Sequence, residues 1–381
     1  MARADIKGRS VPAPPAIKMR LCGGAAKLRY ERSMTLLPLP PQSPDVPWPT
    51  ADWPTGPLPA GVDAARLDRL LDHALSAPST PDLGETHAVL AVQGGRLVLE
   101  RYGPGKGAAD TFPSWSMAKS ITQALCGLLV GDGRLDVHAP ADVPEWAAPG
   151  DPRGAITLDL LLRMSSGLDF LEEYLPDRPS DVIQMLWGPG KDDVAAYAAA
   201  KPLAHEPGRF WYYSSGATNI VARCLARALG QSDGGQAGAG FEAFMRERLF
   251  GPLGMTSPIP KFDAAGTFIG SSFCFCTARD FARFGLFYLR DGVWEGRRLL
   301  PEGWVDYART PTWQQPNEDG PYGAHWWLNL ETGSFAAQGF GGQFIIVAPD
   351  IDLVLVRSGD TPLAQKENIK AWVGEVVGCF R

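Results

Sequence analysis

A serine and a lysine stand three residues apart in the segment FPSWSMAKSITQAL, residues 112–125. Its apolar pattern predicts a helix that begins near Ser116. On such a helix Ser116 and Lys119 lie one turn apart on the same face, so their side chains can touch. A hydroxyl beside an amine that has lost its proton is a nucleophile beside a base, which is the arrangement needed for acyl transfer to serine.

The surroundings of this pair favour the neutral amine. Free N–H groups and the positive dipole end gather where a helix begins, and they favour a developing oxyanion over an ammonium. Neighbouring apolar side chains lower the pKa of a lysine further, and they are Trp115, Met117, Ala118, Ile121 and Leu125. A fall of two to three units from near 10.4 costs roughly 3–4 kcal/mol, which partial burial supplies. The alternative is an N-cap serine followed by a solvated lysine.

A second polar group precedes another predicted helix. Tyr213, Ser214 and Ser215 come directly before GATNIVARCLARAL, whose apolar positions predict a helix that faces the core. A tyrosine at this place could pass a proton to a leaving group. Packing of the aromatic run at 210–213 is the structural alternative.

Composition and charge restrict the function. The chain has 381 residues, 45% hydrophobic and 20% charged, as in ordinary globular proteins. Forty-two acidic and thirty-six basic side chains give a net charge of −6, so neither nucleic acid nor an anionic membrane is expected as a partner. No apolar run approaches the ~20 residues of a membrane span. The cysteine and histidine spacings predict no metal site, and no cofactor is expected.

Strand and helix patterns lie at both ends of the sequence. GVDAARLDRLLDHALS predicts an amphipathic helix capped by Asp63. HAVLAVQ and RLVLERYG, separated by Gly94 and Gly95, predict a β-hairpin, and QFIIVAP and IDLVLVRS predict a second one around Pro349 and Asp350. LAQKENIKAWVGEVVG predicts a closing helix.

Helical patterns dominate between these ends, from about 116 to 261. We therefore predict an α/β domain made of residues 61–120 and 268–381, with an antiparallel sheet flanked by helices and formed by both chain ends. Residues 121–267 are expected to form an inserted, mostly helical domain. Pockets favour domain junctions, so the active site is expected where the two domains meet.

The first 60 residues are rich in proline and are expected to be extended. Part of this segment is expected to lie against the folded body through Trp48 and Trp53. MARADIKGRS lacks the apolar region of a secretory signal, so a cytoplasmic location is expected. Buried, reduced thiols are expected for Cys22, Cys126, Cys224, Cys274, Cys276 and Cys379.

The motifs and their order resemble the serine β-lactamase and penicillin-binding-protein superfamily. Within it, the chain is most similar to class C β-lactamase-like hydrolases, including the nylon-oligomer (6-aminohexanoate dimer) hydrolases. The resemblance covers about residues 61–381 and implies a β-lactamase-like (transpeptidase-like) fold. The motifs matching S-x-x-K and Y-x-N/S are Ser116-Met117-Ala118-Lys119 and Tyr213-Ser214-Ser215. ITLDLLLRMSSGLDF, RLFGPLGM and YGAHWWL match structural signatures of the family.

The third family motif, usually K-T-G or H-x-G, departs from the pattern. AAQGFGGQFIIVAPD has neither lysine nor histidine at that point, which weakens the case for β-lactams as substrates. Its glycine-rich run resembles the nylon-oligomer branch. The N–H of Phe340 is expected to pair with that of Ser116 in an oxyanion hole, where one donor contributes about 3 kcal/mol.

The resemblance assigns roles to the candidate residues. Ser116 attacks, Lys119 takes or relays the proton, and Tyr213 passes a proton to the leaving group. Lys119 and Tyr213 titrate as a coupled pair, and which is the first base stays open. The candidate substrate-binding residues are Ser215, Tyr174, Gly339, Gly341 and Trp327.

The predicted function is a serine hydrolase that cleaves an ester or amide bond of a small molecule through an acyl-serine intermediate. An acyltransferase of the same fold and a non-catalytic ligand-binding relative are the alternatives, and a homodimer stays open. A Ser-His-Asp hydrolase is not expected because G-x-S-x-G is missing. A zinc hydrolase is not expected because His205-Glu206 lacks the second histidine of H-E-x-x-H.

Overall fold

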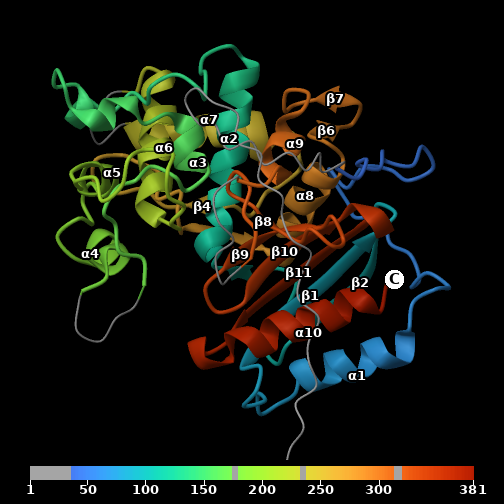
Figure 1. Ribbon diagram of the computed structural model, residues 1–381. Helices are drawn as coiled ribbons and strands as arrows, with labels where there is room; N and C mark the ends of the chain where they lie inside the picture. The colour runs from blue at the N-terminus through green and yellow to red at the C-terminus, as the bar shows by residue number, and fades with distance from the viewer. Residues whose placement is uncertain (1–35, 174–178, 232–236, 313–319) are drawn as a thin grey trace, which may run out of the picture. The chain divides into compact units, whose positions relative to one another are not determined.

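A six-stranded antiparallel sheet with strand order β2-β1-β11-β10-β9-β8 organises the folded chain (Figure 1). The computed structural model describes residues 36–381 except 174–178, 232–236 and 313–319. The strands of this sheet are β1 (Glu85–Gln93), β2 (Arg96–Tyr102), β8 (Trp327–Leu328), β9 (Phe335–Gly339), β10 (Gln343–Ala348) and β11 (Leu353–Asp360). The short strands β3 (Thr111–Phe112), β4 (Ile259–Pro260) and β5 (Cys274–Thr277) form a second sheet, and β6 (Val293–Trp294) pairs with β7 (Arg297–Arg298).

Both predicted hairpins are present, and they pair with each other. Gly94 and Gly95, with φ of 59° and 76°, form the β1–β2 turn, a conformation that favours glycine. The short 3₁₀ turn Pro349–Ile351 joins β10 to β11. Antiparallel pairing of β1 with β11 then brings the two ends of the chain into one sheet.

Side chains alternate between the two faces of the sheet, as strand geometry requires. Val89 and Leu355 face one apolar cluster, which they share with α1 (Ala64–Ala74) and α10 (Lys366–Gly378). Figure 1 shows these two helices side by side along the sheet. Leu90 and Val356 face a second cluster, shared with α8 (Ala278–Leu289). Asp63 caps α1 as predicted, because its side chain accepts from the N–H of Arg66 at 3.0 Å.

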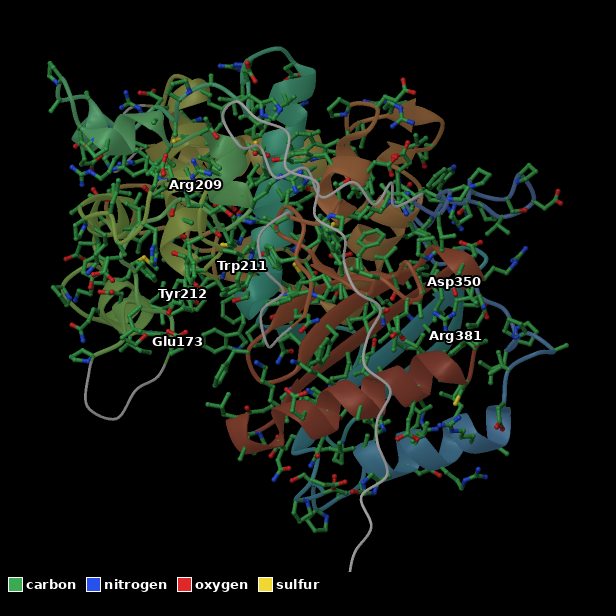
Figure 2. All side chains as sticks on the ribbon, in the orientation of Figure 1. Glu173, Arg209, Trp211, Tyr212, Asp350 and Arg381 are labelled. Carbon is green, nitrogen blue, oxygen red and sulfur yellow. The ribbon has the colours of Figure 1, made fainter. Side chains whose placement is uncertain are left out.

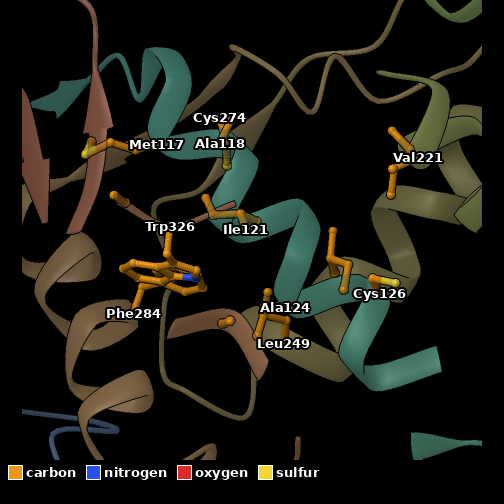
Figure 3. Packing of buried hydrophobic residues seen from close by; sticks show 14 of the residues in the cluster. Met117, Ala118, Ile121, Ala124, Cys126, Val221, Leu249, Cys274, Phe284 and Trp326 are labelled. Carbon is orange, nitrogen blue, oxygen red and sulfur yellow. The ribbon is translucent and has the colours of Figure 1, made fainter. Parts of the chain in front are cut away.

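The helices that position the candidate site come between the two hairpins in sequence. They are α2 (Ala118–Gly131), α3 (Leu158–Leu162), α4 (Asp181–Trp187), α5 (Val194–Ala199), α6 (Ser215–Ala228), α7 (Ala237–Met245), the π-helical turn η4 (Arg246–Phe250) and α9 (Trp304–Arg309). Most of α2 is buried on all sides. Figure 3 shows its Ala118, Ile121 and Ala124 among core side chains that include Phe284 and Trp326. The boundaries of the two predicted domains stay a prediction.

The helix expected to begin at Ser116 begins with a tighter turn. Residues Trp115–Met117 form a 3₁₀ turn, η1, and α2 starts at Ala118. Ser116 is therefore inside a turn and does not cap the helix. Lys119 still follows it by one turn, as predicted.

The described part of the proline-rich segment, residues 36–60, contains no helix and lies against the folded body. Trp53 is buried, and the rings of Trp48 and Trp294 have centroids 4.9 Å apart. The guanidinium of Arg283 donates to the carbonyl oxygen of Pro49 at 2.7 Å. These contacts confirm the expected packing through the two tryptophans, while residues 1–35 lie outside the described residues.

The structure also bears on the state of the cysteines and on the lengths of the helices. Five cysteines, Cys126, Cys224, Cys274, Cys276 and Cys379, are free and buried as expected, and Cys22 lies outside the described residues. Within the described ranges, every helix is too short or too polar to span a bilayer.

Candidate active site

Ser116 lies in the η1 turn, which leads directly into α2. Trp115, just before it, has φ of 43°, a left-handed conformation that bulky residues rarely adopt. Such strain persists only where the surrounding structure holds it. Here the hydroxyl of Ser114 donates to the carbonyl oxygen of Ser272 (3.1 Å) and accepts from the N–H of Cys274 (3.0 Å). The turn is thereby anchored to the chain at β5.

Lys119 directs its amine toward Ser116. Its Nζ atom donates to Oγ of Ser116 (3.0 Å), to Oγ of Ser215 (3.0 Å) and to the carbonyl oxygen of Ser271 (2.9 Å). Lys119 is only 1% exposed, and burial lowers its pKa to about 8 although Glu172 acts in the opposite direction. The structure thus brings the predicted nucleophile and base together, and their catalytic roles stay a prediction.

Tyr213 covers the same amine from another side. The centroid of its ring lies 4.8 Å from Nζ of Lys119, within the range of a cation–π contact. The ring of Trp327 stacks on that of Tyr213 with centroids 5.5 Å apart, and the edge of Tyr322 meets it at 5.9 Å. Three predicted site residues, Lys119, Tyr213 and Trp327, therefore lie in one contiguous group.

Ser215 connects Lys119 to Glu172, a residue that no sequence motif singled out. Its Oγ atom accepts from Lys119 and donates to Oε1 of Glu172 at 2.6 Å, and its N–H donates to Oε2 at 2.8 Å. Loss of water around the carboxyl raises the pKa of Glu172, while Lys119 opposes the rise. The only local signal was the pair of glutamates in LEEYLP.

The neighbouring glutamate faces a different partner. Glu173 is exposed and accepts a hydrogen bond from the hydroxyl of Tyr212. Figure 2 labels both residues, which lie close together near Trp211. The two glutamates therefore occupy different environments, although they are adjacent in sequence.

The predicted glycine run lies against the η1 turn (Trp115–Met117), which we call the nucleophile turn after the predicted role of Ser116. A Cβ atom added to Gly339 would lie 2.4 Å from the carbonyl oxygen of Ser114, so only glycine allows this approach. Gly341 and Gly342 have φ of 69° and 74° and form the turn between β9 and β10. The buried Arg357 donates to the carbonyl oxygens of both, at 2.9 and 2.8 Å. Arg357 was not expected at the site, because it comes from the middle of the β11 pattern.

Four aromatic side chains beside this turn form what we call the aromatic patch: Trp115, Trp187, Phe273 and Phe340. Trp115 is the hub, with ring centroids 5.8 Å from Phe340, 5.7 Å from Phe273 and 6.3 Å from Trp187. Trp187 and Phe340 are 51% and 44% exposed. Since Trp115 directly precedes Ser116, the patch flanks the predicted nucleophile. The role of the Phe340 N–H in an oxyanion hole stays a prediction.

His325 is a buried residue near Lys119. Its Nδ1 lies 2.8 Å from the carbonyl oxygen of Leu162 and its Nε2 lies 3.0 Å from Oγ1 of Thr218. Burial, and then the charge of Lys119, lower the pKa of His325 to about 3, so it is neutral at ordinary pH.

The remaining candidates are Trp327 and Tyr174. Trp326 is fully buried, whereas Trp327 borders the site. Tyr174 lies outside the described residues. In the described part of the chain, no group of three or more His, Cys, Asp or Glu side chains could hold a metal ion.

Comparison with known proteins places this geometry in a family. The model of the family described as Beta-lactamase matches residues 67–368. The chain belongs to the β-lactamase family. This member is 26% identical to the 6-aminohexanoate-dimer hydrolase of Paenarthrobacter ureafaciens over 323 aligned residues, which cover 78% of each chain.

Solved structures share the fold of this β-lactamase-family chain. A Bacillus anthracis protein provisionally described as a 6-aminohexanoate-dimer hydrolase has a TM-score of 0.67 at 24% identity, covering 86% of this chain and 87% of that one. A family VIII carboxylesterase has a TM-score of 0.61 at 14% identity, covering 84% and 99%. The predicted family and the β-lactamase-like (transpeptidase-like) fold are confirmed. The chain is accordingly a β-lactamase-family hydrolase.

Proposed function

We propose that this chain cleaves an ester or amide bond of a small molecule through an acyl-serine intermediate on Ser116. The observation that carries the proposal is the 3.0 Å contact between Oγ of Ser116 and the buried Nζ of Lys119. A lysine with a pKa of about 8 is neutral in roughly a tenth of the molecules at pH 7, against far fewer than one in a thousand for an ordinary lysine. The buried amine is therefore available as a base.

In the proposed acylation, three side chains act in turn. Oγ of Ser116 attacks the carbonyl carbon while its proton passes to Nζ of Lys119. The N–H groups of Ser116 and Phe340 receive the oxyanion, each contributing about 3 kcal/mol to the transition state. Tyr213 then protonates the leaving oxygen or nitrogen as its bond to the carbonyl carbon breaks. Positioned acid–base groups of this kind contribute about 10²–10⁴-fold in rate.

Deacylation repeats the chemistry with water as the nucleophile. Within the Lys119–Tyr213 pair, the phenolate left on Tyr213 after acylation takes a proton of the water molecule as it attacks the acyl carbon, and the proton held by Lys119 is kept for Ser116. The bond to Oγ then breaks, and Ser116 recovers its proton. The products are a carboxylic acid and the free enzyme.

The relatives support both bond types. One relative is named for hydrolysis of the 6-aminohexanoate dimer, an amide, and a structural neighbour is a carboxylesterase. The aromatic patch beside Ser116 supports a substrate with an apolar or aromatic group next to the scissile carbonyl. The missing lysine of the third motif supports weak turnover of β-lactams or none.

A fluorophosphonate probe and three substrates test the proposal. We expect the probe to label Ser116, and we expect hydrolysis of aromatic p-nitrophenyl esters with little turnover of nitrocefin. A linear amide dimer decides whether amides are also cleaved. Ser116→Ala should lose labelling and hydrolysis while the fold is retained.

Three outcomes would contradict the proposal, and two of them favour other functions. If wild-type Ser116 is not labelled, the chain is a non-catalytic ligand-binding relative. If an added alcohol or amine, rather than water, takes up most of the acyl group, the chain is an acyltransferase. Hydrolysis by Ser116→Ala at the wild-type rate would remove the mechanism altogether.

A further inference from the structure

A chain of three hydrogen bonds leads away from the nucleophile into the protein. It runs from Ser116 to Nζ of Lys119 (3.0 Å), from Nζ to Oγ of Ser215 (3.0 Å) and from that Oγ to Oε1 of Glu172 (2.6 Å). The mechanism above uses the first contact only. The chain ends on a carboxylate, which is a group that can hold a proton.

The position of Glu172 is determined on both sides. Its two carboxylate oxygens accept from the hydroxyl and the N–H of Ser215, and its own N–H donates to the hydroxyl of Tyr212 at 3.3 Å. The preceding Leu171 donates its N–H to a carboxylate oxygen of Asp181 (2.8 Å) and accepts from the N–H of the same residue (2.8 Å). These contacts fix the position of the Glu172 carboxylate relative to Ser215.

Burial brings the pKa values of Lys119 and Glu172 closer together. In water a lysine and a glutamate differ by about six pKa units. Burial lowers the pKa of Lys119 and raises that of Glu172, because each loses hydration of its charged form. The pair can be ionised, as an ammonium and a carboxylate, or neutral, as an amine and a carboxylic acid. The free energy needed to convert the ionised form into the neutral form is therefore much smaller in this site than in water.

Other titratable groups face this pair. In the described part of the chain they are Tyr212, Tyr213, Glu173, Tyr322 and His325. Burial raises the pKa values of Tyr212 and Tyr322 and lowers that of His325. These three groups therefore stay neutral between pH 5 and 9.

We propose that Glu172 is the internal proton acceptor for Lys119 and that the hydroxyl of Ser215 carries the proton between them. One N–H proton of Lys119 passes to Oγ of Ser215 while the hydroxyl proton of Ser215 passes to Oε1 of Glu172. The ammonium and carboxylate become an amine and a carboxylic acid, and the hydroxyl is regenerated. Rotation about the Cε–Nζ bond then turns the amine lone pair toward Ser116. Glu172 acts through Lys119 and does not touch the substrate.

This inference rests on the proposed function and makes a distinct prediction about pH. With the relay, kcat/KM of the wild type falls with decreasing pH only when the pH is low enough to protonate Glu172. We call this falling part of the pH profile the acid limb. In Glu172→Gln, Lys119 must release its proton to solvent, so the acid limb of the kcat/KM profile moves to higher pH, from the pKa of Glu172 to that of Lys119. If Glu172 acts only as a negative charge, its removal lowers the pKa of Lys119 and the limb moves to lower pH.

The experiment compares five proteins in ester hydrolysis and in fluorophosphonate labelling across pH 5–9. They are the wild type, Glu172→Gln, Ser215→Ala, the double variant of these two, and the control Glu173→Gln, whose carboxylate accepts a hydrogen bond from Tyr212 instead. We expect kcat to fall about 100-fold in the first two variants, with KM within about threefold of wild type. Their double variant should be no slower than either single variant, because both interrupt one relay. Glu173→Gln should keep the wild-type kcat, and its acid limb should not move to higher pH, because the charge of Glu173 raises the pKa of Glu172.

Each other outcome contradicts a named part of the inference. An acid limb that stays in place or moves to lower pH in Glu172→Gln and Ser215→Ala overturns the relay. A rise in KM alone in Ser215→Ala makes Ser215 a substrate-binding residue instead. A wild type that is not labelled at any pH overturns both the relay and the proposed function, whereas a labelled wild type with unshifted variants overturns the relay alone.

A measurement on the unmodified enzyme covers the case in which the variants do not fold. In mixtures of H₂O and D₂O, a relay that moves more than one proton in the slow step makes kcat fall along a curve as the D₂O fraction rises. A straight line contradicts the proposal.

Discussion

The ring of Tyr213 lies over the amine of Lys119, with Nζ 4.8 Å from the ring centroid. This contact separates two roles of the tyrosine, since the ring stabilises the ammonium while the phenol could carry a proton. Removing the hydroxyl and removing the ring should therefore have different effects.

Tyr213→Phe keeps the ring and its stacking on Trp327. We expect kcat for p-nitrophenyl esters to fall about 100-fold, with little change in Tm. Tyr102→Phe is the matched control, because that hydroxyl donates to Glu100 on the same strand, at 2.6 Å. Full activity in Tyr213→Phe would mean that another group protonates the leaving group.

Gly339→Ala tests the approach of β9 to the nucleophile turn. The added methyl would lie 2.4 Å from the carbonyl oxygen of Ser114 and 3.1 Å from Cβ of Trp115. We expect a loss of about 1–3 kcal/mol in the free energy of unfolding and a lower kcat, because the turn must move. Gly374→Ala on α10, where nothing lies within 4 Å, should instead stabilise by about 0.5–1 kcal/mol. Equal stabilities for the two variants would contradict the contact.

His325 should make the fold sensitive to acid. Its pKa falls from 6.5 in the unfolded chain to about 3 in the folded protein. Between pH 6.5 and 3, His325 therefore binds a proton in the unfolded chain but not in the folded protein. Stability is then lost as pH falls through 6.5, by about 2–3 kcal/mol between pH 6.5 and 4.5. His325→Asn tolerates the left-handed φ of 60° and does not titrate. Denaturant unfolding should give a flatter pH dependence for this variant than for the wild type, and identical slopes would contradict the pKa shift.

Trp187→Ala tests the aromatic patch as a substrate surface. Trp187 is half exposed and stands 6.0 Å from Phe273, ring to ring. We expect kcat/KM for an aromatic ester to fall about tenfold through KM, and that for acetate esters to change little, because only the larger group reaches the patch. Leu363→Ala, which removes an exposed apolar side chain outside the patch, should leave both unchanged. A uniform loss on both esters would point to a disturbed nucleophile turn.

Periodicity predicted the elements that carry the site. The hairpins of β1–β2 and β10–β11 and the helices α1, α2 and α10 follow patterns that repeat within a few residues. The expectation that both chain ends share one sheet came from the strand patterns at the two ends, whereas no local signal predicted the direct pairing of β1 with β11. The first turn of the helix that carries Lys119 was predicted less well. The 3₁₀ geometry at Trp115 depends on the hydrogen bond from Ser114 to Ser272 and on the close approach of Gly339, and both are tertiary contacts.

The sequence by itself determined that Ser116 and Lys119 meet, because a serine and a lysine three residues apart on a helix must share a face. Only the tertiary structure decided which groups surround that amine. Glu172 and Tyr213 reach Lys119 from segments more than fifty residues away, and Arg357 holds the glycine turn from another strand. Contacts of this kind depend on how the whole chain closes around its core, whereas a helical spacing depends only on backbone geometry.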